Sequence, residues 1–362
     1  MTKPRDVSQP SFAVSKVKAF TEDIPDILHY TTGGGERRLH AILPRMEYAV
    51  FSLGSNDPLA EKIAQHLGTH LGKINLKTFA DGEQHVQFME NLRGKSIFLV
   101  QSTNPPADNW VRLFLALDAA HGASAAEITA VLPYFGYARQ ERKGKPREPI
   151  SARVFSVIIE KMGANKVLTM DLHADAMGGF FRKTNVDYLY ARPVFLSFFS
   201  KFFKKEIANE EIVVVSPDVG GVARAQSFAK RLMTNADLAI IHKERKVANQ
   251  IAKMRLVGDV KGKIALIVDD MADTCGTLAK ASEVLMENGA KAVYACATHA
   301  LLSKDANATI DASPIERLFV TDTVAANITS QKIEVISVAE IFADAIRRIN
   351  QGESLSALFE VD

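Results

Sequence analysis

The stretch IALIVDDMADTCGT, from Ile264 to Thr277, constrains the fold and the chemistry of this chain more than any other part of the sequence. Its apolar run, 264–268, predicts a short, fully buried strand of a parallel sheet. Asp269 and Asp270 follow directly, and small and hydroxylated residues then lead into a predicted helix that runs to about Glu287. The start of a helix presents unpaired N–H groups and the positive end of the helix dipole, so the loop before this helix suits a phosphate group.

The acid pair limits what else the phosphate site can hold. Two carboxylates beside a phosphate repel it unless they accept hydrogen bonds from sugar hydroxyls or face a bridging metal ion. The stretch therefore predicts a site for a phosphorylated sugar. For an Asp-Asp pair alone we would favour a plainer interpretation, in which the acids cap a helix, as in many α/β proteins with unrelated chemistry.

Length and composition limit the class of protein. At 362 residues the chain is long enough for two or three domains with cores of their own. Its net charge of +2 gives no global attraction to nucleic acid or to a membrane surface. No apolar run approaches the roughly 18–20 residues that span a bilayer. The two cysteines, Cys275 and Cys296, fit a reducing compartment, and we expect a cytoplasmic protein.

Residues 1–45 show no sustained periodicity, and we interpret them as a partly ordered extension. Organelle targeting by this segment is the less favoured alternative, because presequences are poor in acids. The segment contains Asp6, Glu22, Asp23 and Asp26.

From Tyr48 onward, short apolar runs alternate with helical patterns, which is typical of βαβ units and a mainly parallel sheet. The predicted strands are 49–53, 74–79, 96–101, 128–133, 166–170, 212–216, 238–242, 264–268, 292–298, 317–321 and 333–337. The predicted helices are 59–67, 109–121, 150–162, 221–232, 277–287 and 338–350. The pattern indicates two similar α/β domains in tandem, with a boundary between Val186 and Pro193.

Further polar motifs follow predicted strands, where ligands of open parallel sheets gather. Phe79–Glu83 (FADGE) by itself is a plain turn, because Asp-Gly is a frequent turn pair. Tyr134–Lys143 combines aromatic residues with cations, and the basic cluster consists of Arg139, Arg142, Lys143, Lys145 and Arg147. A solvated loop face usually explains such a run, but aromatic residues beside Arg139 and Gln140 suit a triphosphate and a base better.

Three more motifs have both a structural and a functional interpretation. A histidine at a strand end, as in Asp171–Asp175 (DLHAD), is more often structural, and Asp-x-His suits Mg²⁺ only where the ion also binds phosphates. Ser216–Gly221 (SPDVGG) before a helix is also an N-cap turn. The charged run His242–Lys246 (HKERK) begins at a strand end, which permits a mobile flap over a site.

Residues 264–277 resemble the phosphoribosyl pyrophosphate (PRPP) loop of type I phosphoribosyltransferases. Their exact sequence resembles that of the ribose-phosphate pyrophosphokinases, or PRPP synthetases. The other motifs stand in that family's order, over residues 48–359. The resemblance implies an α/β fold of two tandem phosphoribosyltransferase type I-like domains with mainly parallel sheets. Glu141, where the family more often has Asp, and GGFFR over 178–182, where it has Gln-Gly-Phe-Phe-Asp, depart from its pattern.

The resemblance also implies a division of the chain. We expect an N-terminal extension over 1–45, an ATP-side domain over 46–190 and a ribose 5-phosphate-binding domain over 191–340. A C-terminal helix and tail over 341–362 would return to the first domain.

The implied reaction is transfer of the β,γ-pyrophosphoryl group of ATP to the anomeric hydroxyl of ribose 5-phosphate, which gives PRPP and AMP for nucleotide biosynthesis. The family's catalytic flap matches Lys243 and Arg245. Its ATP contacts match Phe79, Asp81, Glu83, Arg139, Gln140 and His173. Its ribose 5-phosphate contacts match Asp269, Asp270, Asp273, Thr274, Cys275, Gly276 and Thr277. Its Mg²⁺ ligands match Asp171, His173 and Asp218.

Assembly and regulation come from the resemblance alone. It implies a homo-hexamer or another dimer-based homo-oligomer, in which the FADGE segment crosses a subunit interface, and phosphate and ADP as effectors. Two alternatives remain. A base-salvage phosphoribosyltransferase would share residues 268–277 but lack the other motifs, and a non-catalytic synthetase-associated protein would keep the fold while its catalytic motifs decay.

Overall fold

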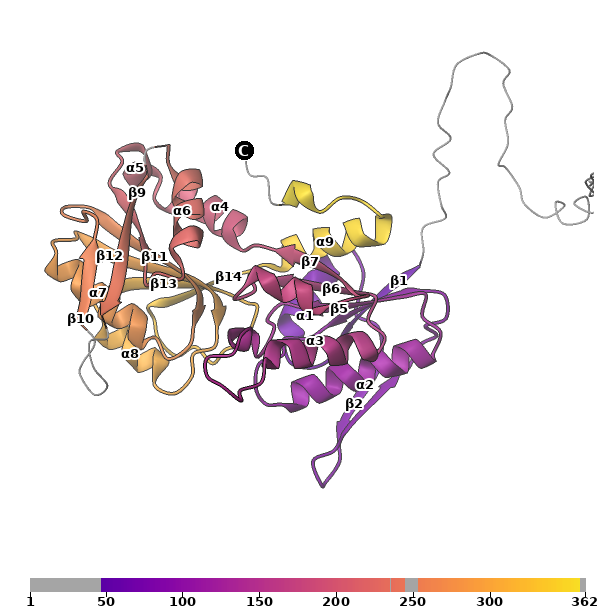
Figure 1. Cartoon of the computed structure of the whole chain (residues 1–362). Helices are drawn as coiled ribbons and strands as arrows, with labels where there is room; N and C mark the ends of the chain where they lie inside the picture. Colours follow the sequence, from indigo (N-terminus) through magenta and orange to yellow (C-terminus); the bar gives the residue numbers. More distant parts are fainter. Residues whose placement is uncertain (1–46, 235, 245–252, 359–362) are drawn as a thin grey trace, which may run out of the picture. The chain divides into compact units, whose positions relative to one another are not determined.

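The computed structural model describes residues 47–358, apart from Asn235 and residues 245–252. Two large sheets and the helices packed on them make up most of this part of the chain, and a two-stranded hairpin is separate from both sheets (Figure 1). The predicted alternation of strands and helices, with mainly parallel pairing, is confirmed.

The first sheet has five parallel strands in the order β1-β4-β5-β6-β7. They are β1 (Tyr48–Ser52), β4 (Ser96–Val100), β5 (Glu127–Leu132), β6 (Lys166–Met170) and β7 (Asn185–Leu189). Successive side chains of a strand point to opposite faces, so each face packs separately. The buried residues of α2 (Asp108–Gly122) and α3 (Ser151–Lys161) pack on one face, and those of α1 (Asp57–His66) and α9 (Ala339–Gln351) pack on the other.

The second sheet has seven strands in the order β10-β9-β8-β11-β12-β13-β14, all parallel except β10, which is antiparallel to β9. They are β8 (Ile212–Ser216), β9 (Asp237–Glu244), β10 (Lys253–Val257), β11 (Ile264–Ala272), β12 (Ala292–Ala300), β13 (Ile315–Thr321) and β14 (Ile333–Ile336). Packed on one face are α4 (Arg192–Phe202) and α6 (Val222–Leu232), with the short α5 (Lys204–Ala208) after α4. Packed on the other face are α7 (Gly276–Glu287) and α8 (Ala306–Ala312).

The burial of the central strands explains why they could be predicted from the sequence. Every residue of β4 (SIFLV) and of β8 (IVVVS) is buried, because helices cover both faces of each sheet. Such strands are continuous apolar runs instead of alternating ones. The strands that the sequence did not predict are β3 (Gln84–Phe88), β7 and β10, whose residues are more polar.

The predicted strand 74–79 exists, but its place differs from a βαβ arrangement. β2 (Ile74–Thr78) pairs in antiparallel fashion with β3, and this hairpin belongs to neither large sheet. The FADGE segment forms its turn, where the Phe79 N–H donates to the Glu83 carbonyl at 2.8 Å. The hairpin packs against α2 through β3. The Phe79 side chain is 42% exposed at this tip.

The two sheets share one apolar core. Val50 and Phe98 of the first sheet belong to the same buried cluster as Leu266 and Phe319 of the second, and Phe342 of α9 joins it. Since α9 packs on α1, the end of the described chain lies against its beginning. Residues Arg45–Asp362 form one compact unit, so the boundary near 190 stays a prediction. Among the helices of the described residues, none combines the length and the apolar character that crossing a membrane requires.

Candidate active site

The acid pair lies inside β11 and not after it, which corrects the predicted end of this strand at residue 268. β11 continues to Ala272 because the parallel β12 is equally long: Asp269 pairs with Ala297, and Met271 pairs with His299. The two carboxylates are therefore fixed by sheet hydrogen bonding. This rigidity suits a binding site, because side chains on strands are placed more accurately than those on loops.

One arginine that the sequence did not single out faces both acids. Arg224, in the first turn of α6, places its Nη1 3.5 Å from Asp269 Oδ1 and 3.4 Å from Asp270 Oδ1. Burial and the neighbouring charge of Asp270 raise the pKa of Asp269 to about 7. Burial also acts to raise the pKa of Asp270, but the hydrogen bond from His173 and the Arg224 charge outweigh it and hold that pKa below its usual range. The pair thus holds a proton on Asp269 up to about neutral pH.

His173 links the first sheet to this acid pair. It follows β6, and its Nδ1 donates to Asp270 Oδ2 at 2.7 Å, although the two residues are 97 positions apart. The hydrogen bond to Asp270 raises the pKa of His173, against the opposing effect of burial. The contact therefore favours an imidazolium beside a carboxylate.

A second contact joins the two halves of the predicted site. Arg139, in the short helix η1 (Ala138–Gln140) after β5, donates from Nη1 to Asp273 Oδ2 at 2.7 Å. Its Nε contacts the Met271 sulfur. The predicted triphosphate residue and the predicted sugar-phosphate loop therefore touch each other directly.

The phosphate loop has the geometry that the sequence indicated. Cys275 adopts a left-handed conformation with φ of 60° and precedes the first residue of α7, Gly276. A β-carbon added at Gly276 would meet only Thr274 Oγ1, at 3.9 Å, so the helix start is open. Burial raises the pKa of the Cys275 thiol to about 12, which makes it an inert loop residue instead of a nucleophile.

Asp171 is held by residues of both sheets. Its Oδ2 accepts hydrogen bonds from Thr298 Oγ1 at 2.6 Å and from the Ala191 N–H at 3.1 Å. Its carbonyl accepts from His299 Nε2 at 3.3 Å, and Nδ1 of this buried imidazole lies 3.0 Å from Thr323 Oγ1. These contacts fix Asp171 in an uncommon conformation, with φ of 39°. We call the contact of Asp171 with Thr298 and His299 the strand-end brace.

The remaining predicted residues lie apart from these contacts. Asp218 is exposed, and its Oδ1 accepts from the Gly221 N–H at 2.9 Å, which closes the turn before α6. In the described part of the chain, no hydrogen bond or ring contact joins the hairpin tip with Phe79 to Arg139. Gln140 Oε1 accepts from the Ser151 hydroxyl. Lys243 lies at the end of β9, opposite Met254, and Arg245 lies outside the described residues.

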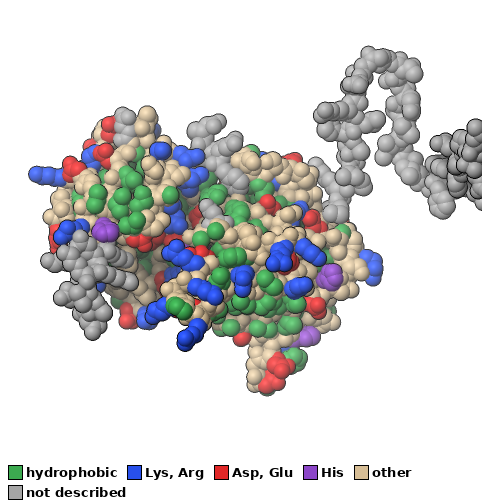
Figure 2. All heavy atoms as spheres, viewed as in Figure 1, with side chains coloured by type: hydrophobic (Ala, Val, Ile, Leu, Met, Phe, Trp, Pro, Cys, Tyr) green, Lys and Arg blue, Asp and Glu red, His purple; other side chains and the backbone are tan. Residues whose placement is uncertain are grey.

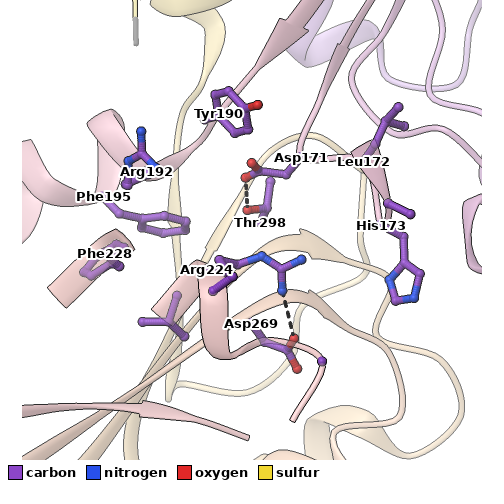
Figure 3. Close-up of a pocket in the computed structure, with 14 residues that line it drawn as sticks. Asp171, Leu172, His173, Tyr190, Arg192, Phe195, Arg224, Phe228, Asp269 and Thr298 are labelled. Carbon is purple, nitrogen blue, oxygen red and sulfur yellow. Dashed lines mark hydrogen bonds and ion pairs between the residues drawn. The ribbon is translucent and has the colours of Figure 1, made fainter. Parts of the chain in front are cut away.

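A cavity of about 520 Å³ opens beside these groups (Figure 3). Asp171, His173, Arg224 and Asp269 line it, and Thr298 stands next to Asp171. The exposed cations Arg142, Lys143, Lys145 and Arg147 follow η1. Figure 2 shows Lys and Arg side chains gathered around a hollow in the face drawn there. Such a rim attracts anions toward the hollow.

The donor set can be compared with the needs of a divalent cation. Within the described residues, no group of three or more His, Cys, Asp or Glu side chains is placed to enclose a metal ion. Mg²⁺ does not require one, because it is usually held by one or two carboxylates together with phosphates and waters. Asp171 and Asp269 present two carboxyl groups to one cavity, so the residues fit such an ion.

Comparison with known proteins identifies the family. Residues 48–163 match the N-terminal domain of ribose phosphate pyrophosphokinase, and residues 246–360 match the phosphoribosyl synthetase-associated domain. The chain is 45% identical to a ribose-phosphate pyrophosphokinase of Porphyromonas gingivalis, over 86% of this chain and 97% of that protein. The chain belongs to the ribose-phosphate pyrophosphokinase family.

Other members of this family give the same result. A ribose-phosphate pyrophosphokinase of Caldanaerobacter subterraneus is 47% identical over 86% of this chain and 97% of that protein. The crystal structure of phosphoribosylpyrophosphate synthetase from Mycobacterium smegmatis covers 84% of this chain and 99% of that one, with 35% identity and a TM-score of 0.79. The predicted family and its α/β fold of two phosphoribosyltransferase type I-like domains are confirmed.

The strand-end brace gives a stability prediction. Thr298→Val removes a hydrogen bond to a carboxylate and should lower the free energy of unfolding by about 1.5–3 kcal/mol. Thr169 is the matched control, since it is equally buried at the end of β6 but its hydroxyl has no described partner. Thr169→Val should change stability by less than about 0.5 kcal/mol. Urea unfolding measures both, and equal losses in the two variants would contradict the brace.

The acid pair gives a pH prediction. Because the pKa of Asp269 is about 7 in the folded protein and 3.8 ordinarily, the folded state keeps a proton that the unfolded state loses. Stability from this group therefore falls as pH rises from about 4 to 7. Asp269→Asn should lack this slope and gain relative to the wild type across the window, in urea unfolding at several pH values. Asp118→Asn, at an exposed acid on α2, is the control. Parallel pH profiles for wild type and Asp269→Asn would refute the prediction.

Proposed function

We propose that this chain transfers the β,γ-pyrophosphoryl group of ATP to the anomeric hydroxyl of ribose 5-phosphate, which gives PRPP and AMP for nucleotide biosynthesis. The observation that carries the proposal is the contact of Arg139 with Asp273 at 2.7 Å. We take the loop with Arg139 as the triphosphate loop and the loop with Asp273 as the sugar-phosphate loop, and the contact supports this assignment because the two substrates would then be adjacent. The ribose-phosphate pyrophosphokinases that the chain resembles over nearly their full length support the same reaction.

Ribose 5-phosphate would bind along the end of β11 and the start of α7. The 5-phosphate occupies the loop Asp273–Thr277, where N–H groups of the helix start and the hydroxyls of Thr274 and Thr277 are the donors. Asp269 and Asp270 accept hydrogen bonds from the 2- and 3-hydroxyls of the ribose. The pKa of Asp269, raised to about 7, supports this role, because a buried acid pair gains from donors or a cation beside it.

ATP would bind on the side of the first sheet. Arg139, Gln140 and His173 contact the phosphates and the nucleoside, and each follows a strand of that sheet. The hairpin residues Phe79, Asp81 and Glu83 contact the adenine and the ribose of ATP bound to a neighbouring subunit. Their exposure at the hairpin tip, together with the absence of described contacts to Arg139, supports this assignment. The assembly is then a homo-hexamer or another dimer-based homo-oligomer.

The divalent cation of the proposed reaction is Mg²⁺, which would be held by Asp171, His173 and Asp218 together with the substrate phosphates. His173 would bind it through Nε2 after losing the proton that its contact with Asp270 favours. It would neutralise phosphate charge as the pyrophosphoryl group moves. Asp171 fits because the hydrogen bonds from Thr298 and Ala191 both go to Oδ2. We also propose that phosphate and ADP regulate the protein and that it acts in the cytoplasm, where free, buried thiols such as Cys275 and Cys296 persist.

The chain's own residues would act mainly by positioning and charge. The anomeric oxygen forms a bond to the β phosphorus, and the bond from this phosphorus to the AMP oxygen breaks. Little covalent work is left for side chains, so fixed donors around the phosphates supply most of the catalysis. Lys243 and Arg245 stabilise the charge that grows on the phosphates when the segment after β9 closes over them.

Product identity tests the proposed reaction. With Mg·ATP and ribose 5-phosphate, the purified protein should form AMP and PRPP in equal amounts, measured by chromatography of the nucleotides and sugar phosphates. A sugar kinase would form ADP instead, because attack would fall on the γ phosphorus. A salvage transferase would need a base and PRPP, and a synthetase-associated protein would bind nucleotide without turnover. ADP as the stoichiometric product would reject the proposal.

The role of Lys243 has a separate test. If it acts in the transition state, Lys243→Ala should lower kcat and kcat/KM together by about 10²–10³-fold while the affinity for ATP stays nearly normal. Lys261→Ala, at an exposed lysine in the turn between β10 and β11, is the control and should leave both constants unchanged. A higher KM at unchanged kcat would make Lys243 an ordinary binding residue.

A further inference from the structure

Two guanidinium groups of the second sheet's helices converge on one hydroxyl. Arg192, the first residue of α4, donates from Nη1 to Ser227 Oγ at 2.8 Å. Arg231 of α6 donates from its own Nη1 to the same oxygen at 3.0 Å. We call Arg192, Ser227 and Arg231 the arginine pair site. None of the three belongs to the residues assigned to ATP, ribose 5-phosphate or the metal.

The two positive charges are only partly balanced, because the charge of Asp171 acts on Arg192 without forming an ion pair with it. Within the part of the chain that the structure describes, no ion pair joins Arg192 or Arg231 to a carboxylate, whereas Arg224 on the same helix faces two. Burial and the charge of Arg231 lower the pKa of Arg192. In addition, Arg192 Nε is buried without a hydrogen-bond partner among the described residues. Like charges this close repel each other, and a buried unpaired donor adds a further cost.

The hydroxyl between the arginines has a donor to spare. A serine oxygen accepts two hydrogen bonds and donates one. The two guanidinium groups use the acceptor capacity of Ser227 Oγ, and no described group accepts its hydrogen. The site thus combines two cations, an unused N–H and an unused O–H, a combination that suits an anion.

The arginine pair site borders the cavity of the candidate active site. Arg192 and Tyr190 line that cavity, and the Tyr190 ring lies 5.6 Å from the Arg192 guanidinium carbon, a contact that supports the cation from one side. In Figure 3 these two residues lie across the cavity from His173 and Asp269, with Asp171 and Thr298 between them. An anion at Arg192 would therefore be separate from one held by the loop 273–277.

We propose that Arg192, Arg231 and Ser227 form a second anion site, which binds the dianion of a phosphate group. Arginine matches phosphate because its planar fork donates two parallel hydrogen bonds to two oxygens. A dianion would balance both guanidinium charges, and the Ser227 hydroxyl would donate to a third oxygen. This inference goes beyond the proposed function and concerns binding, not turnover; only the use of ribose 5-phosphate to occupy the loop 273–277 in its test rests on the proposed function.

The test uses the full chain and inorganic phosphate at constant ionic strength, with chloride as the replacement salt. Phosphate binding is measured by calorimetry with and without ribose 5-phosphate, which occupies the loop 273–277. Arg192→Gln and Arg231→Gln should each weaken phosphate binding in the presence of ribose 5-phosphate by at least about tenfold, the scale of a hydrogen bond to a charged group. Lys230→Gln, at the exposed cation next to Arg231 on α6, should leave it unchanged.

A second measurement separates ligand binding from a purely structural role. In phosphate-free buffer, Arg192→Glu should raise the unfolding temperature, because a carboxylate beside Arg231 replaces repulsion by attraction, and this gain outweighs the smaller repulsion from Asp171. The same variant should lose the stabilisation that phosphate gives the wild type. A structural role for Arg192 predicts the reverse, a lower unfolding temperature with the phosphate response retained, and that result would overturn the proposal.

The source of the phosphate group is decided by a parallel titration with ADP. If Arg192→Gln weakens the binding of inorganic phosphate and not that of ADP, the site takes free phosphate. If it weakens ADP binding more, the site takes the phosphate of a nucleotide. Equal binding of both ligands by wild type, Arg192→Gln and Lys230→Gln would reject the second anion site. So would complete loss of wild-type phosphate binding when ribose 5-phosphate is present.

Discussion

The candidate site depends on how the end of β6 is held against the end of β12. Asp171 directly follows β6 of the first sheet. Thr298 of the second sheet donates to its side chain, and His299 donates to its carbonyl. Asp171 reaches this arrangement only with a positive φ, which costs backbone energy and is retained because several hydrogen bonds fix it. The brace makes the carboxyl ends of parallel strands from two separate sheets face one cavity. His173 can then reach Asp270, and Arg139 can reach Asp273.

The acids of the site form ion pairs with the cations beside them. Asp270 has His173 and Arg224, Asp273 has Arg139, and Asp269 is left with the raised pKa. Under the proposed function, each of these pairs is one that a substrate replaces. A phosphate at Arg139 competes with Asp273, and sugar hydroxyls or a cation at the acid pair take the place of the proton on Asp269. The ligand-free protein thus holds the site in shape with contacts that binding exchanges.

The arginine pair site is the exception to this arrangement. Arg192 and Arg231 share a hydroxyl, and among the described residues neither forms an ion pair with a carboxylate, so the charge of Asp171 balances them only in part. An anion there would lie in a cavity whose other wall carries Asp171 and Asp269. Because Asp171 already interacts electrostatically with Arg192, a bound dianion would act on the same residue that the strand-end brace holds. Anion binding at the arginine pair site is therefore coupled electrostatically to Asp171 in the strand-end brace.

The sequence alone determined those strands and loops whose structure depends on residues that are neighbours in the chain. Continuous apolar runs such as β4 and β8 are readable because helices bury both their faces, and the loop Asp273–Thr277 is readable because a strand, small residues and a helix stand in succession. The tertiary structure decided the rest. β3 and β10 are edge strands, each paired with one antiparallel neighbour, and such strands can carry polar residues. β11 continues past its two acids because the parallel β12 pairs with that part of it. Arg224, Thr298 and His299 carry no local signal, since each becomes part of the site only when two sheets, far apart in the chain, bring their carboxyl ends together.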